Sequence, residues 1–240
     1  ASPGLVYLAS AGSGVFRTVD GGASWSFGIG GTGGLSVNEV HSAGGVPVYV
    51  GSSSAAVWSS FDGVNFAPSS GGIGALNVEG VAVDATNPDL IAAAYQGLND
   101  GGVQTSSDGG LTWSVEPLPG TRFNDCGFAP DGKLFAISDG PTTIAPEGLY
   151  RRDGGSWTSI GPDQGSAFES ELFTLDFGVL DADHIVAGGS DFGVAGHEAT
   201  LWTTTDGGGT WTKTYESALE FRDVRDVRFL TDGSNATLVA

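Results

Sequence analysis

One pattern constrains the fold of this chain more than any other feature, because it occurs five times. The copy at residues 102–113 reads GVQTSSDGGLTW: an apolar strand, a Ser/Thr position, an aspartate, two glycines and an aromatic residue. The other copies span residues 14–25, 56–66, 148–157 and 200–211. An aspartate that begins a turn accepts hydrogen bonds from the following backbone N–H groups, and glycine supplies the positive φ that such turns need. The pattern therefore predicts five hairpin turns of identical shape.

This turn chemistry explains every repeated position, so we expect an architectural rather than a catalytic role for these residues. Two copies are shortened: Asp62 is followed by Gly63 and Phe66, and Asp153 is preceded by Arg151 where Ser or Thr is usual. The predicted turn residues are Asp20, Asp62, Asp108, Asp153 and Asp206, with the tryptophans Trp25, Trp113, Trp157 and Trp211.

The pattern resembles the Asp-box, S/T-x-D-x-G-x-T-W, of bacterial neuraminidase repeats and other β-propellers of that superfamily. Three copies match it fully, those with Asp20, Asp108 and Asp206. The resemblance covers the whole chain and implies an all-β propeller of four-stranded antiparallel blades, with about five Asp-box blades. In that superfamily the boxes lie outside the functional site, so they indicate the fold rather than an activity.

The repeat period of about forty to fifty residues indicates one toroidal array, so residues 1–240 are expected to form a single propeller domain. The 41 glycines suit many short strands joined by tight turns. Residues 221–240 allow two interpretations. Either Val224 to Leu230 completes the first blade and closes a five-bladed ring, which removes exposed sheet edges, or the chain is part of a larger propeller.

The apolar patterns between the boxes predict two further sets of strands. The innermost strands are expected at residues 37–43, 78–84, 124–129, 172–178 and 224–230. The strands next to them are expected at residues 5–9, 46–51, 90–95, 134–138, 184–188 and 237–240.

The charge of the chain limits the classes of partner that it can bind. The formal net charge is −19, which repels nucleic-acid phosphates and anionic lipid, so neither nucleic acid nor membrane insertion is expected. The single Cys126 forbids an internal disulfide, and the absence of Met predicts a processed or excised chain. These features favour an extracellular, cell-surface or periplasmic protein.

The sequence places its candidate ligand site at two inserts, Asp139 to Glu147 and Ser190 to Ala199, next to the connection that holds Phe168, Glu169 and Glu171. Connections longer than the minimum are where repeat scaffolds carry function. Carboxylates beside aromatic rings suit a sugar, because the acids accept hydroxyl hydrogen bonds and the rings cover its apolar faces. The predicted acceptors are Asp139, Asp191, Glu169 and Glu171, and the predicted stacking surface is Phe168 or Phe192.

These observations favour a non-catalytic module that binds a glycan or a protein. The alternatives are a glycoside hydrolase, or a fragment of one, and a purely structural scaffold. No pair of catalytic carboxylates is singled out, and the Arg-Ile-Pro motif of sialidases is absent. His41, His184 and His197 have no metal-ligand spacing, so no metal or cofactor is expected. The oligomeric state stays open.

Overall fold

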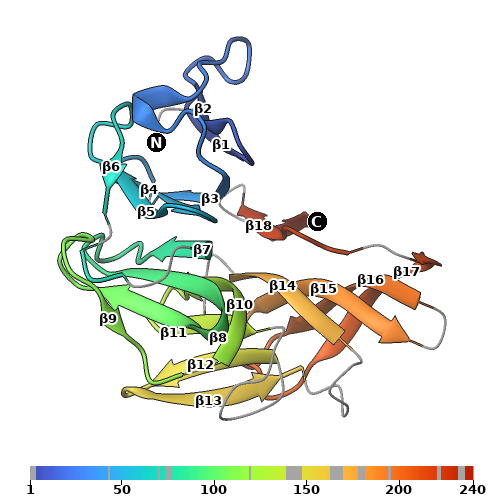
Figure 1. The fold of residues 1–240 in the computed structure, drawn as a ribbon. Coiled ribbons are helices and arrows are strands. Elements are labelled where there is room, and N and C mark those ends of the chain that lie inside the picture. Colours follow the sequence, from blue (N-terminus) through green and yellow to red (C-terminus); the bar gives the residue numbers. More distant parts are fainter. Residues whose placement is uncertain are drawn as a thin grey trace. The chain divides into compact units, whose positions relative to one another are not determined.

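A computed structural model of the chain describes two compact units, which are treated separately here (Figure 1). Unit 1 contains residues 1–97 and 101–116, and unit 2 contains residues 98–100 and 117–240. The structure describes residues 4–42, 44–69, 71–73, 77–118, 120–138, 148–162, 170–177, 182–193, 196–220, 223–231 and 236–239.

Unit 1 consists of antiparallel strands and one short 3-10 helix. β1 pairs with β2, the strands β3 to β6 form a four-stranded sheet in chain order, and β8 pairs with β7 and β9. Its elements are β1 (Val6–Ser10), β2 (Gly14–Thr18), η1 (Ile29–Gly31), β3 (Val37–Ser42), β4 (Val48–Ser52), β5 (Ala56–Ser60), β6 (Ala67–Pro68), β7 (Val78–Val83), β8 (Ile91–Ser106) and β9 (Ser114–Val115).

Unit 2 also consists of antiparallel strands. The strands β10 to β13 pair in chain order, as do β14 to β17, and β18 pairs with β19. Its elements are β10 (Gly120–Phe128), β11 (Leu134–Ser138), β12 (Gly148–Asp153), β13 (Ser156–Gly161), β14 (Ser170–Phe177), β15 (Ile185–Gly193), β16 (Gly196–Thr204), β17 (Thr212–Glu220), β18 (Arg228–Thr231) and β19 (Ala236–Val239).

The expected all-β class is confirmed. The described residues contain no helix that is long and apolar enough to span a membrane. One expected strand differs from the structure: the segment predicted at residues 224–230 is irregular up to Val227, and β18 begins at Arg228. The irregular part still packs as an inner strand does, because the Val224 N–H donates to the Gly189 carbonyl oxygen (3.0 Å). Ring closure and a single domain stay predictions.

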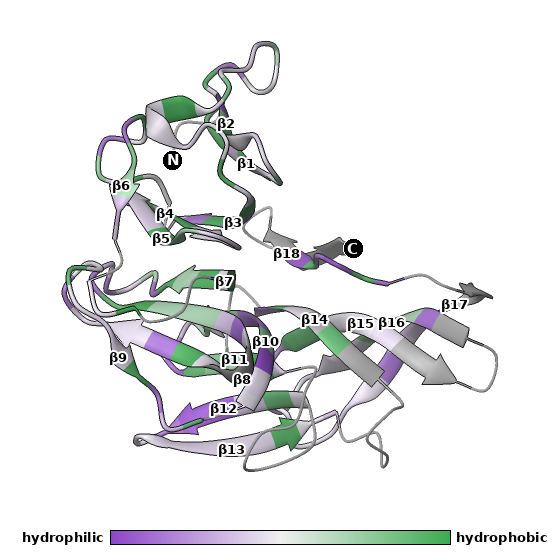
Figure 2. Ribbon diagram, in the orientation of Figure 1, coloured by the Kyte–Doolittle hydropathy of each residue, from purple (hydrophilic) through white to green (hydrophobic). Residues whose placement is uncertain are grey.

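The core is built by buried strands near the start of each sheet: β4 and β11 are buried at every residue, whereas the first strands of their sheets, β3 and β10, are only partly buried. β7 is hydrophobic, as its green colour in Figure 2 shows, and it is almost wholly buried. It packs with β4 and β5 through Tyr49 and Val57. Gly51 on β4 allows this close packing, since a Cβ there would lie 2.8 Å from a methyl group of Val78. In unit 2, Gly188 on β15 meets Val224 in the same way, at 2.6 Å.

Four strands, β3, β7, β10 and β14, contain an irregularity of register at the same place, after Val37, Val78, Phe123 and Leu172. A β-bulge leaves an extra residue free of the ladder and re-aims its side chain. In β3 the two residues that follow Val37 use this freedom. Asn38 donates through its side chain to the Val78 carbonyl oxygen (2.9 Å), and Glu39 accepts from the Val81 N–H (2.7 Å).

The strand β10 of unit 2 makes the same two contacts with β14. The Asn124 side chain donates to the Leu172 carbonyl oxygen (2.8 Å), and the carboxylate of Asp125 accepts from the Leu175 N–H (3.0 Å). We call this pair of contacts the bulge contact. Neighbouring sheets in each unit are therefore joined by polar bonds at the bulge as well as by apolar packing.

Candidate functional site

Three of the aspartate turns share one set of hydrogen bonds. Asp20 accepts from the N–H of Ser24 (2.9 Å) and from its hydroxyl (2.6 Å), and the Thr18 hydroxyl donates to Asp20 (2.7 Å). The Thr18 oxygen also accepts from the Gly22 N–H (3.0 Å). The same set of bonds recurs around Asp108, with Ser106 and Thr112, and around Asp206, with Thr204 and Thr210.

These donors keep the turn carboxylates ionised. Hydrogen bonds, first of all from the Thr112 hydroxyl, lower the pKa of Asp108 to about 2. The pKa of Asp206 is also lowered to about 2, first of all by the Thr204 hydroxyl. A carboxylate held in this way serves the turn and is a poor proton donor near neutral pH.

The second turn is a shorter variant of the same design. Asp62 accepts from the N–H groups of Val64 (2.8 Å) and Asn65 (2.7 Å) and from the Asn65 side chain (2.8 Å). The Ser60 hydroxyl adds a fourth bond (3.0 Å). The hydrogen bonds from Asn65 are the main reason that the pKa of Asp62 lies well below its usual range.

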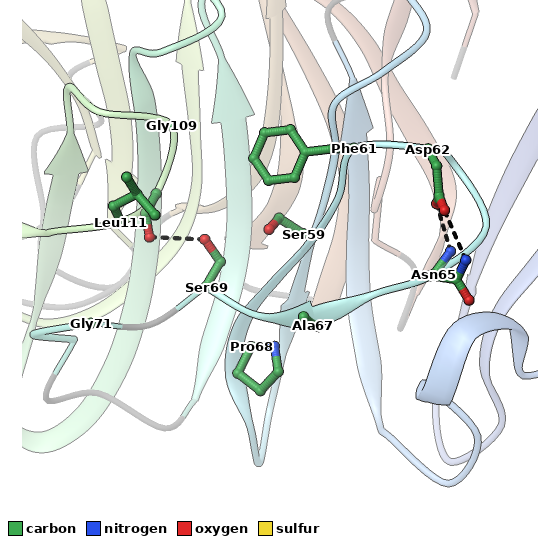
Figure 3. Close-up of a pocket in the computed structure, with 11 residues that line it drawn as sticks. Ser59, Phe61, Asp62, Asn65, Ala67, Pro68, Ser69, Gly71, Gly109 and Leu111 are labelled. Atoms are coloured by element: carbon green, nitrogen blue, oxygen red, sulfur yellow. Dashed lines mark hydrogen bonds between the residues drawn. The ribbon is translucent and has the colours of Figure 1, made fainter.

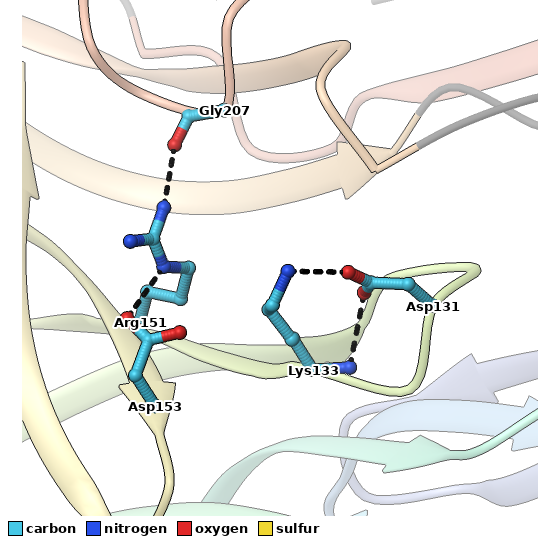
Figure 4. A network of polar contacts seen from close by, with 5 residues as sticks. All are labelled: Asp131, Lys133, Arg151, Asp153 and Gly207. Carbon is cyan, nitrogen blue, oxygen red and sulfur yellow. Dashed lines mark hydrogen bonds and ion pairs between the residues drawn. The ribbon is translucent and has the colours of Figure 1, made fainter.

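The fourth copy does not have the shape that its sequence predicts. β12 and β13 pair up to Asp153 and Ser156, so the turn holds only Gly154 and Gly155, both with positive φ (57° and 91°). Such a two-residue hairpin leaves no loop for the aspartate to cap. Asp153 instead accepts from the Arg151 side chain (2.8 Å), as Figure 4 shows.

A second contact holds three of the turns to the preceding sheet, and we call it the turn clamp. It is a side-chain donor to the carbonyl oxygen of the first glycine after the turn aspartate. The donor is the Tyr7 hydroxyl for Gly63 (2.9 Å) and the Tyr49 hydroxyl for Gly109 (3.2 Å). In unit 2 the donor is Nη1 of Arg151, for Gly207 (3.0 Å).

The tryptophans reinforce these contacts. The Trp113 ring nitrogen donates to the Ser69 carbonyl oxygen (2.9 Å), and that of Trp211 donates to the Ile160 carbonyl oxygen (2.7 Å). Trp25 lies against Gly22 of its own turn, and Trp157 is buried.

A hollow of about 480 Å³ lies between the second and third turns of unit 1. Figure 3 shows the Phe61 ring extending from the second turn toward Leu111 of the third; the two side chains are 66% and 73% exposed. Its lining consists of Ser59, Phe61, Asp62, Asn65, Ala67, Pro68, Ser69, Gly71, Gly109, Gly110 and Leu111.

The hollow offers free polar atoms beside apolar walls. Among the described residues, the Ser59 hydroxyl and the side-chain oxygen of Asn65 have no hydrogen-bond partner. The Ser69 hydroxyl is already bonded to the Gly110 carbonyl oxygen (2.9 Å). Among the described residues of the lining, Asp62 is the only one with a carboxylate. The hollow can therefore hold a ligand that is partly apolar and also donates hydrogen bonds.

The inserts that the sequence favours as a ligand site are only partly described. Asp139, Phe168 and Glu169 lie outside the described residues. The other three predicted site residues lie on paired strands, Glu171 on β14 and both Asp191 and Phe192 on β15. Register pairs Glu171 with Ser190 and Asp191 with Ser170, so the backbones of the two acids are neighbours.

One buried acid was not singled out by the sequence. Asp125 on β10 is 8% exposed, and its carboxylate accepts from the N–H groups of Cys126 (2.8 Å) and Leu175. Burial raises its pKa to about 7, although these bonds and the charge of Arg228 oppose the shift. The Asn-acid pair at residues 38–39 and 124–125 is the signal that could have indicated its role.

Comparison with known proteins supports the fold. No family model matches the chain, and no curated protein matches it. A GH74 xyloglucanase from Xanthomonas campestris has a similar structure, with a TM-score of 0.63 and 19% identity over 88% of this chain and 36% of the other. The extracellular domain of BT4673 from B. thetaiotaomicron gives a TM-score of 0.63 and 15% identity over 95% of this chain and 28% of the other.

A third similar structure is YCF48 from Cyanidioschyzon merolae, with a TM-score of 0.54 and 14% identity over 95% of this chain and 86% of the other. The chain thus spans about a third of the length of the first two proteins and most of the third. At these identities the likeness concerns the fold alone, and that fold is a β-propeller.

Proposed function

We propose that this chain is a non-catalytic recognition module, a propeller of the Asp-box type with four-stranded blades, that binds a partner through the hollow between its second and third turns. The observation that carries the proposal is the pairing of two exposed apolar side chains, Phe61 and Leu111, with unbonded polar atoms of Ser59 and Asn65. Binding sites combine apolar walls with a few placed polar groups in this way.

The electrostatics of the hollow favour binding over hydrolysis. Glycoside hydrolysis usually needs two carboxyl groups, one of which is protonated to donate to the leaving group. The lining contains one carboxylate, Asp62, whose four donors and lowered pKa keep it ionised. A hydrolase, or part of one, is the alternative, because the xyloglucanase shares the fold. A purely structural scaffold is the third possibility.

The sequence-predicted site in unit 2 is a second candidate for ligand binding. The register of β14 and β15 favours it, because the backbones of Glu171 and Asp191 are neighbours. An extracellular, cell-surface or periplasmic location suits either site, and the extracellular domain from B. thetaiotaomicron shares the fold.

A binding screen tests the proposal. The chain is applied to a glycan array and to a peptide library, with chromogenic glycosides run in parallel for turnover. Replacing Phe61 by Ala should abolish the binding that is found, whereas replacing Phe27, which is 71% exposed and lies outside the hollow, should not. If the Phe61→Ala variant still binds, the hollow is not the binding site. Steady turnover of a glycoside would contradict the non-catalytic assignment.

A further inference from the structure

In three sheets, a residue on the strand that leads into the turn is paired with a residue on the strand before it. Tyr7 pairs with Arg17, Tyr49 with Ser59, and Phe135 with Arg151. Directly paired residues of antiparallel strands project from the same face of the sheet. The position therefore holds an arginine in the first and fourth repeats and the small Ser59 in the second.

Unit 2 shows what an arginine does there. Arg151 donates through Nε to the turn aspartate Asp153 (2.8 Å) and through Nη1 to the carbonyl oxygen of Gly207 (3.0 Å). Figure 4 shows the guanidinium group between these two acceptors. Its sheet partner Phe135 has no hydroxyl, so Arg151 provides the turn clamp.

The second repeat, in unit 1, has the same acceptors with Ser59 in place of the arginine. Gly109 corresponds to Gly207, since each follows its turn aspartate with a similar φ (69° and 68°). Tyr49 occupies one lone pair of the Gly109 carbonyl oxygen, and a carbonyl oxygen has two. The turn aspartate is Asp62, and the hollow is lined by Ser59, Asp62 and Gly109.

We propose that the hollow takes a guanidinium group, the side chain of an arginine on a protein partner. A planar guanidinium donates hydrogen bonds in a fixed fork and packs its face on aromatic rings. The exposed ring of Phe61 lines the hollow and offers such a face. The proposal deepens the recognition function above and rests on it. A net charge of −19 also draws cationic partners toward the surface.

The state of Asp62 supports this assignment. Its hydrogen bonds keep the carboxylate ionised, and three of its four donors bind Oδ1, so Oδ2 has acceptor capacity left. The two apolar side chains at the rim suit the aliphatic stem of an arginine, which long charged side chains lay along apolar surface.

Two small probes test the proposal on the unchanged chain. N-acetyl-arginine amide is titrated into labelled protein and followed by amide chemical shifts, with N-acetyl-citrulline amide as the neutral probe of the same shape. The arginine probe should shift the amide signals of Asn65, Gly109 and Leu111. The citrulline probe should bind with an affinity at least about tenfold lower. Equal binding of the two probes, or shifts confined to other residues, would overturn the proposal.

A filled hollow provides the second test. Ser59→Arg supplies the guanidinium from the chain itself, as Arg151 does in unit 2, and should abolish probe binding without lowering Tm. Ser54→Arg, the control, adds the same charge at an exposed turn position outside the hollow and should bind the arginine probe as the unchanged chain does. Full binding by a folded Ser59→Arg variant would refute the assignment. If Phe61→Ala abolishes binding of a partner for which the arginine probe does not compete, the proposed function stands and only the guanidinium inference fails.

Discussion

The two units hold their turns through the same backbone acceptor with different side chains. In unit 1 the Gly109 carbonyl oxygen is bound by the hydroxyl of Tyr49, which is neutral and fully buried. In unit 2 the Gly207 carbonyl oxygen is bound by Arg151, which is charged and 29% exposed. The difference shows that the position of the acceptor is set by the turn, whereas the donor can come from either of two neighbouring strands.

The exchange of donors changes the surroundings of the contact. Tyr49 makes the contact without an arginine at the paired position, where Ser59 is small and the hollow opens beside it. An arginine fills that space and binds the turn aspartate as well. The turn clamp of unit 1 therefore coexists with a candidate binding site, and that of unit 2 does not.

The bulge contact gives the largest expected difference between the units. Because burial raises the pKa of Asp125 to about 7, the folded state keeps a proton that the unfolded chain releases near pH 4. The stabilisation is complete below pH 4 and is lost as the pH rises through 7, by a few kcal/mol over the whole range. Asp125→Asn should flatten this pH dependence in urea unfolding. Glu39→Gln at the matching place in unit 1 should leave it unchanged; equal effects of the two would contradict the contrast.

Loss of the charged turn clamp comes next. Arg151→Ser removes the donor to Gly207 and the contact with Asp153, and we expect unit 2 to lose about 1–3 kcal/mol. Hydrogen exchange of the Gly207 amide, which is bonded to the Asp183 carbonyl oxygen, reports this unit. Adding Phe135→Tyr should restore part of the loss, since the tyrosine would take the place that Tyr49 has in unit 1. A double variant no more stable than Arg151→Ser would show that the donors are not interchangeable.

The neutral turn clamp should matter less. Tyr49→Phe keeps the packing and removes one hydroxyl, so we expect a loss of about 1 kcal/mol in unit 1. Exchange of the Gly109 amide, bonded to the Asp89 carbonyl oxygen, is the measurement. Raising the salt concentration should narrow the gap between this variant and Arg151→Ser, because salt screens only the exposed charged pair. A gap independent of salt would count against the role of charge.

The smallest effect is expected at a single turn. Asp108→Asn keeps the size of the side chain but loses the ionised acceptor, and Tm should fall by a few degrees at most. Partner binding through the hollow should not change. The pKa of Asp108 is lowered to about 2, so its stabilising effect is present above pH 4 and is lost as the pH falls toward 2. Loss of binding at unchanged Tm would give this aspartate a functional role.

The sequence predicts the strands and three of the turns well, because both depend on residues that are neighbours in the sequence. The strands β4, β7 and β11 follow apolar runs, and the turns at Asp20, Asp108 and Asp206 are formed by hydrogen bonds among their own residues. The copies at Asp62 and Asp153 are both one residue shorter than the others between the aspartate and the aromatic residue, but only the copy at Asp153 folds as a two-residue hairpin, with Gly154 and Gly155 at positive φ. The length and the residue types of the pattern therefore do not predict which of the two shapes forms.

The turn clamp and the hollow could not be predicted from the sequence because they depend on register. Only the pairing of Tyr49 with Ser59, and of Phe135 with Arg151, shows that these positions are equivalent. The hollow also depends on the small side chain of Ser59. A serine on a strand does not by itself indicate a binding site. The inserts with Asp139 and Asp191 stay a prediction.

The acceptor of the turn clamp is a peptide carbonyl oxygen, and this has a consequence for how such repeats diverge. A substitution can remove a tyrosine or an arginine, but it cannot remove a carbonyl group. After a repeat is duplicated, a lost donor can therefore be replaced by a side chain on either of two strands that reaches the same oxygen. A copy that passes through such an exchange keeps its place in the array while the space beside the donor opens or closes, so new pockets can emerge without new loops.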